Sequence, residues 1–152
     1  MSLVQRLLAL RSPLAGSGVN HEGERFTATL EIVRLAGGRA ALLNYTATAV
    51  DGRHLHAEST LIGTSAGGAL CLWPVMEELP FVLPHEQTAA EETAIECRAV
   101  FATGPRNERG SFREEITIAL RQDGSVVYAH AWGMPDGDFD ERSRCLLREG
   151  TA

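Results

Sequence analysis

Lysine is absent from this chain, and all fourteen basic residues are arginine. The arginines are scattered along the sequence and form no basic stripe, so we attribute the bias to the composition of the source rather than to an anion-binding surface. Acidic residues outnumber basic ones, and the net charge is −6. A chain with this balance lacks a surface that neutralises phosphates, so we expect no nucleic-acid partner.

Cysteine is scarce, and long apolar runs are missing. Cys71, Cys97 and Cys145 are far apart, odd in number and without metal-type spacing, which argues against a disulfide framework or a zinc site. The apolar N-terminal stretch is interrupted by Arg6 and Arg11, and it is too short for a signal peptide or a membrane span. We therefore expect a reducing, cytoplasmic compartment and no membrane partner.

What the sequence does contain is a succession of strand patterns. The clearest runs from Ser125 to Met134, where bulky residues with polar tips alternate with small ones. Its bulky face carries Val126, Tyr128, His130, Trp132 and Met134. Such a face is typical of a strand that lines a wide interior, and it indicates a barrel with contents.

Similar patterns and turn signals extend over most of the chain. We expect further strands at 25–35, 39–50, 53–63, 69–73, 93–103, 112–121 and 139–148, several of them joined by Gly-Gly or Asp-Gly turns. Residues 14–18 form either a short first strand or an extended lead into one. Residues 2–11 predict a short amphipathic helix, with Ser2 as its N-cap and Pro13 as its stop, which covers an open end of the barrel.

The interval from Pro74 to Glu92 breaks this rhythm. Pro74, Pro80 and Pro84 oppose a regular central strand, so we expect a long connection over the barrel end, either a ligand gate or an ordinary crossing loop. A helix over 86–97 is the alternative. The period of two from residue 93 onward disfavours it.

Together these elements predict one domain over residues 1–152. Its fold class is all-β: an up-and-down antiparallel β-barrel of 8–10 strands with one short N-terminal helix capping an end. A chain of 152 residues is long enough to bury a sizeable core.

Several segments carry a family resemblance. The chain has a helix, PLAG followed by SG, a long meander, LHAES on an early strand and VVYAHAWGMPDG before the last strand. This order resembles the calycin superfamily, and within it the fatty-acid-binding-protein-like barrels that include nitrobindin-type haem proteins. The resemblance implies a ligand-holding barrel. Two features depart from it: Ser17 replaces the tryptophan expected after the first glycine in lipocalin-like barrels, and the final strand has no histidine to bind a haem.

Five side chains on the predicted inner faces are candidate ligand contacts: Tyr45, Glu114, Tyr128, His130 and Trp132. An imidazole between two aromatic rings can hold a ligand or bind iron, although a core histidine satisfied by Tyr128 or water fits the pattern as well. An inward carboxylate at Glu114 needs a partner, a proton or water, and we favour a position at the barrel mouth.

Two histidines and a glutamate alternate on the strand at 53–63. His54, His56 and Glu58 have a spacing that a mononuclear metal site could use. Burying Leu55 and Leu61 instead contributes about 1.5–3 kcal/mol each, whereas burying the polar set without a metal costs as much or more. We therefore predict that the three polar residues face solvent, and we assign no metal ligand.

No catalytic residue is assigned, and we favour binding over catalysis. Cys97 and Cys145 are expected to be small interior hydrophobes, and no phosphate-binding loop is present. The expected function is binding of a small apolar or amphipathic ligand inside the barrel, with any cofactor undetermined and a homodimer left open. Two alternatives are a haem-binding sensor or isomerase of nitrobindin type and a metal-dependent barrel enzyme using His54, His56 and Glu58.

Overall fold

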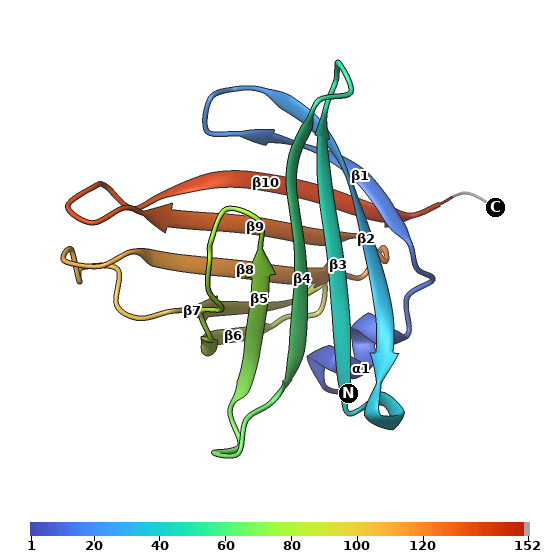
Figure 1. The fold of residues 1–152 in the computed structure, drawn as a ribbon. Coiled ribbons are helices and arrows are strands. Elements are labelled where there is room, and N and C mark those ends of the chain that lie inside the picture. The colour runs from blue at the N-terminus through green and yellow to red at the C-terminus, as the bar shows by residue number, and fades with distance from the viewer. Residues whose placement is uncertain (151–152) are drawn as a thin grey trace.

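The computed structural model describes residues 1–150, which form a closed barrel of ten antiparallel strands with one short α-helix (Figure 1). Each strand pairs with its neighbour in the chain, and β1 pairs with β10 to close the barrel. This confirms the predicted fold class. The elements are α1 (Leu3–Leu8), β1 (Leu14–Asn20), β2 (Arg25–Leu35), the 3-10 turn η1 (Ala36–Gly38), β3 (Ala40–Ala49), β4 (His54–Thr64), β5 (Leu70–Met76), β6 (His85–Glu92), β7 (Glu96–Ala102), β8 (Arg113–Arg121), β9 (Val126–Gly133) and β10 (Asp140–Glu149).

The barrel wall folds into two layers that cross each other. In Figure 1, β3, β4 and β5 pass in front of β7 to β10 and run across them. The inner faces of both layers share one core, because alternate residues of each strand point inward. Among its fully buried side chains are Leu14, Leu30, Leu43, Phe101, Ile116, Ile118 and Leu147.

Helix α1 covers one end of the barrel, as the sequence predicts. The Ser2 side chain accepts a hydrogen bond from the Gln5 backbone, and the Gln5 side chain accepts one from the Ser2 backbone, which forms a capping box. Leu3, Val4 and Leu7 are buried in the core beside η1 and the adjoining ends of β2 and β3. No helix among residues 1–150 is long and apolar enough to cross a membrane.

Part of the predicted connection from Pro74 to Glu92 is strand. β5 continues through Pro74 to Met76. Pro74 is tolerated in the strand because it has a paired strand on one side only, where it lies opposite Thr60 of β4. On its other side, β6 pairs with β5 only at Cys71 and Leu72, so the proline interrupts no ladder there.

The remaining connection is short, at residues 77–84, and the chain then forms β6. The alternative prediction of a helix over 86–97 is therefore wrong. The following strand begins at Glu96 and not at Thr93, because the Thr93 side chain accepts hydrogen bonds from the backbone of Ile95 and Glu96 and forms the turn. Residues 14–18, for which the sequence left a strand or an extended lead open, belong to the full strand β1.

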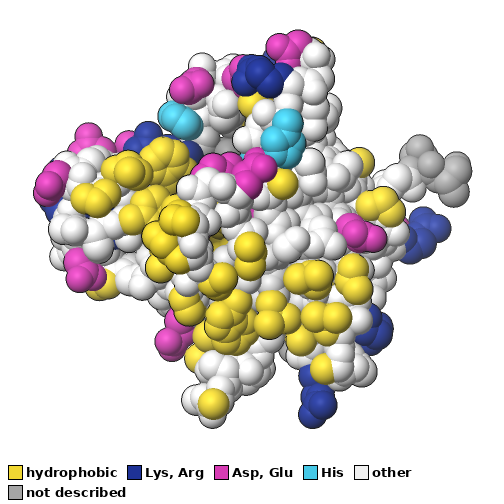
Figure 2. Space-filling view, in the orientation of Figure 1, with side chains coloured by type: hydrophobic (Ala, Val, Ile, Leu, Met, Phe, Trp, Pro, Cys, Tyr) yellow, Lys and Arg dark blue, Asp and Glu magenta, His cyan; other side chains and the backbone are white. Residues whose placement is uncertain are grey.

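An apolar row lies on the outside of the barrel. Val33, Leu42, Leu61 and Trp73 are direct cross-strand neighbours on β2, β3, β4 and β5. Figure 2 shows hydrophobic side chains gathered over β3, β4 and β5 on the face toward the viewer. Leu61 is thus half-buried on the outer face by its neighbours, so an apolar residue on β4 did not have to point inward.

Strand β1 approaches β10 closely at Gly16. A Cβ atom at this position would overlap the Leu146 carbonyl group, which belongs to the backbone and cannot move aside. We expect Gly16→Ala to lower the free energy of unfolding by about 2 kcal/mol or more, since the strand that closes the barrel must shift.

Urea denaturation measures this loss, and Gly110→Ala is the matched control because nothing lies within 4 Å of a Cβ there. Equal stability of the two variants would show that β1 does not depend on the close approach.

Candidate functional site

A cavity of about 640 Å³ lies at the barrel end opposite α1. Its walls are mostly apolar, and they include Phe26, Ala47, Leu55, Met76, Phe81, Phe112 and Trp132. Polar lining residues include Tyr45, His56, Glu78, His130, Arg142 and Ser143. The volume is typical of a site for a small organic molecule.

Two β-bulges direct extra side chains into this cavity. On β4, Ala47 pairs with His56 and Thr48 with His54, so Leu55 is the unpaired extra residue. On β10, the pairing skips Arg142 in the same way. In each case the bulged residue and its successor both line the cavity: Leu55 with His56, and Arg142 with Ser143. Bulges re-aim side chains in this manner next to functional sites.

The bulge overturns the predicted orientation of β4. His56 lines the cavity and Glu58 is buried, with 4% of its surface exposed, so both point inward and not to solvent. Only His54 faces outward, where it pairs with Glu77 at 2.6 Å. The desolvation cost of the buried carboxylate is offset by hydrogen bonds and opposite charges from partners inside the barrel.

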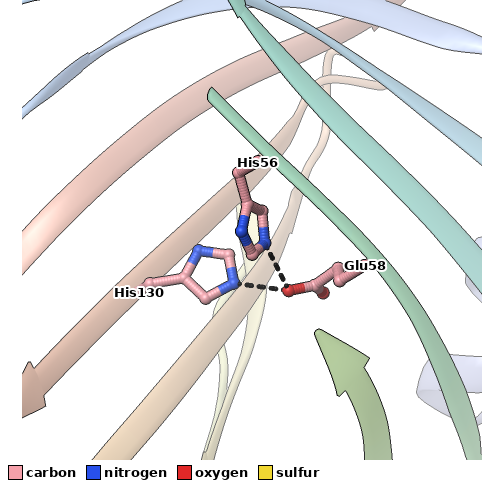
Figure 3. A group of neighbouring side chains, drawn as sticks. All are labelled: His56, Glu58 and His130. Carbon is pink, nitrogen blue, oxygen red and sulfur yellow. Dashed lines mark hydrogen bonds and ion pairs between the residues drawn. The ribbon is translucent and has the colours of Figure 1, made fainter. Parts of the chain in front are cut away.

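Glu58 accepts four hydrogen bonds. Its Oε2 atom accepts from His130 Nε2 at 2.9 Å and lies 3.1 Å from His56 Nε2 (Figure 3). Its Oε1 atom accepts from the Tyr128 hydroxyl and from Thr60 Oγ1. Because His56 and Glu58 come from β4 and His130 comes from β9, the carboxylate links opposite walls of the barrel across its interior.

The same carboxylate organises the aromatic rings around it. Tyr45 stacks on Tyr128 with ring centroids 4.9 Å apart, and His130 meets the edge of Tyr128 at 5.3 Å. Burial, followed by the negative charge of Glu58, raises the pKa of Tyr128 well above its usual value. Burial is also the main cause that raises the pKa of Tyr45. Both phenols are therefore neutral hydrogen-bond donors at physiological pH.

Charge is paired within the cluster. Burial alone lowers the pKa of His56, but the hydrogen bonds and charges of Glu58 and Glu78 outweigh it and raise the pKa to about 9. Glu78 accepts from His56 Nδ1 at 2.7 Å, so each ring nitrogen faces a carboxylate and the ring is held as a cation. Burial opposes ionisation of Glu58, yet His130 and then His56 hold its pKa well below the usual range.

A second buried pair supports the cavity wall. His85 Nε2 lies 3.0 Å from Glu114 Oε1, and His85 Nδ1 donates to the Leu83 carbonyl at 2.7 Å. His85 thereby ties the end of the 77–84 connection to β8. Glu114 lines the cavity as expected, but with 3% of its surface exposed it is a paired interior residue rather than a water-reached mouth residue.

The rim next to β9 is held by a buried guanidinium. Arg113 donates to the backbone carbonyls of Arg106, Met134 and Gly137 at 2.7–2.9 Å. This fixes the loop after β9, whose Met134 and Pro135 line the cavity. Arg113 and His85 were not singled out in the sequence, because strand patterns reveal neither the loop carbonyls that both bind nor the pairing of His85 with Glu114, 29 residues away.

Four of the five candidate contacts line the cavity: Tyr45, Glu114, His130 and Trp132. Tyr128 lies beneath the floor, fully buried, and orients Glu58. The residues that sequence reasoning placed outside, His56 and Glu58, are central. One signal could have found them: Tyr128 and His130 were expected inside, and two buried donors need a buried acceptor.

Three donor atoms of this cluster lie close enough to hold a metal ion. His56, Glu58 and His130 each offer one ligand atom, and these atoms lie within 4.8 Å of one another. Two imidazoles and one carboxylate are a ligand set used by zinc and non-haem iron.

Comparison with known proteins shows a fold likeness. No family model and no curated protein matches this sequence. The crystal structure of Rv2717c from M. tuberculosis is similar, with a TM-score of 0.76 and 13% sequence identity over 99% of each chain. Such a likeness shows the barrel fold, and the calycin and nitrobindin resemblance stays a prediction.

The charge state of His56 predicts a pH-dependent stability. Its pKa rises from 6.5 unfolded to about 9 folded, so its contribution is complete below pH 6.5 and disappears as the pH rises through 9. In the wild type we expect the free energy of unfolding to decline by about 1–3 kcal/mol between pH 6.5 and 10. The His56→Gln variant should lack this decline.

Urea denaturation in buffers free of divalent ions measures the decline. His54→Gln is the control, because His54 lies on the outer face of the same strand and should leave the pH profile unchanged. A His56→Gln profile as steep as that of the wild type would contradict the assigned charge.

Proposed function

We propose that this protein binds a small, uncharged amphipathic molecule inside the barrel. The observation that supports it is the cavity of about 640 Å³, with apolar walls and a polar floor at His56 and His130. Ligand sites of this kind bury the apolar body of a molecule and fix its orientation through a few polar groups.

The pairing of the cationic side chains favours an uncharged polar group on the ligand over an anionic one. Protonated His56 lies between Glu58 and Glu78, so its single positive charge is already matched by two carboxylates and is not free to bind an anion. The Arg142 guanidinium stacks on Trp132 at 4.4 Å, donates to the Trp132 and Asp138 carbonyls and lies 4.0 Å from the Asp140 carboxylate. An anionic ligand would lose its hydration without gaining an unpaired cation, whereas a hydroxyl or carbonyl group can hydrogen-bond to an uncharged lining residue such as Ser143.

Two other functions considered from the sequence have less support. A haem-binding function of nitrobindin type has less support because β10 has no histidine, and the haem ligand of such proteins is sought on the final strand. A metal-dependent enzyme using His54, His56 and Glu58 has less support because His54 faces away from the other two residues, so the three do not form one metal site.

Filling the cavity tests ligand binding. We expect the wild type to bind the neutral dye Nile red saturably near one equivalent, with enhanced and blue-shifted fluorescence. Ala47→Phe places a ring in the cavity and should weaken binding by at least about tenfold, because the dye loses the space and apolar surface it needs.

Thr46→Phe is the matched control, since Thr46 is exposed on the outer face of the same strand. Circular dichroism checks that both variants are folded. Native mass spectrometry of gently purified protein searches for the natural ligand. Unchanged dye binding by Ala47→Phe would place the dye elsewhere and remove the support for an interior site.

A further inference from the structure

We propose that His56, Glu58 and His130 form a binding site for one divalent transition-metal ion, such as Zn²⁺, at the floor of the cavity. Such a site goes beyond the proposed small-molecule binding and does not depend on it. The spacing of the donor atoms, the groups behind them and the open side toward the cavity support it.

The donor spacing matches that of a coordination sphere. The two histidine Nε2 atoms lie 3.1 and 2.9 Å from Glu58 Oε2 (Figure 3). Ligands that bind an ion at about 2.1 Å are about 3.0 Å apart in octahedral geometry and about 3.4 Å apart in the tetrahedral geometry that Zn²⁺ prefers, so the three donor atoms need to separate by only a few tenths of an ångström. An ion can therefore take the place of the Nε2 protons. His56 keeps its Nδ1 proton toward Glu78 and releases the Nε2 proton to solvent, while His130 binds through Nε2 with its proton on Nδ1, toward Ser143 Oγ.

Each ligand is oriented from behind by another group. Glu58 Oε1 accepts from Tyr128 and Thr60, which leaves Oε2 as the free ligand atom. His56 Nδ1 donates to Glu78 at 2.7 Å, and His130 Nδ1 lies 3.4 Å from Ser143 Oγ. Protein metal sites hold their histidines and carboxylates through outer partners of this kind, which fix the tautomer and the ring orientation.

The site is accessible from one side only. His56 and His130 line the cavity, while the Glu58 side chain lies below them without solvent exposure. Three protein ligands leave coordination positions that face the cavity, as in metal sites that bind water or another small ligand. Among residues 1–150, no other group of three such side chains comes together, since His54–Glu77 and His85–Glu114 are pairs.

Titration calorimetry with ZnCl₂ tests the site in untagged protein dialysed against a chelator. We expect the wild type to bind one Zn²⁺ per chain. His56→Asn, Glu58→Gln and His130→Asn should each weaken binding by about 100-fold or more, and Glu78→Gln by about tenfold because it removes only an outer partner. His54→Asn, the matched surface control, should bind as the wild type does.

Histidine ring NMR signals of the wild type provide a readout that needs no variant. Zn²⁺ should shift the signals of His56 and His130 and leave those of His54 and His85 unchanged. Circular dichroism and thermal melting show whether each variant is folded. If a variant is unfolded, the NMR shifts of the wild type decide whether its histidine is a ligand.

Several results would overturn the site. They are the absence of stoichiometric binding to the wild type, equal binding by a folded His130→Asn variant, and Zn²⁺-induced shifts confined to His54. Nile red binding measured separately in chelator-treated protein keeps a failure of the metal site distinct from a failure of ligand binding.

Discussion

The buried carboxylate of Glu58 is the constraint on which the interior of this barrel depends. A buried charge is strongly unfavourable unless hydrogen bonds and opposite charges replace the water it loses. Here the replacement comes from Thr60 and His56 on the same strand and from Tyr128 and His130 on β9. Because these donors lie on opposite walls, satisfying one side chain sets the inward face of β4 and holds β4 and β9 together across the core.

The position of the cavity follows from how the two ends of the barrel are built. At one end α1 inserts Leu3 and Leu7 and completes the core. At the other end no helix of residues 1–150 closes the barrel, and the bulges on β4 and β10 turn Leu55 and Arg142 toward the open space. The fold thus provides a dense apolar half for stability and a hollow half whose floor is polar.

The polar floor can serve a ligand or a metal ion because its groups are held in place before anything binds. Tyr128 and Thr60 orient one oxygen of the carboxylate, and Glu78 orients His56. Side chains that are already ordered lose little conformational entropy on binding, which increases affinity. The same hydrogen bonds explain how a charged cluster persists in an otherwise apolar cavity.

The sequence by itself determined the barrel, the terminal helix and the inward face of β9, because periods of two, turn residues and an N-cap residue are local signals. Tyr45, His130 and Trp132 could be found inside the barrel from that alternation alone. The tertiary structure decided the orientation of β4. Whether Glu58 is buried depends on a bulge at Leu55 and on donors about seventy residues away, and neither follows from local alternation. The free energy of a buried charge depends on the groups that surround it. Only the closed barrel brings the partners of Glu58 together, so only the tertiary structure could make its burial favourable.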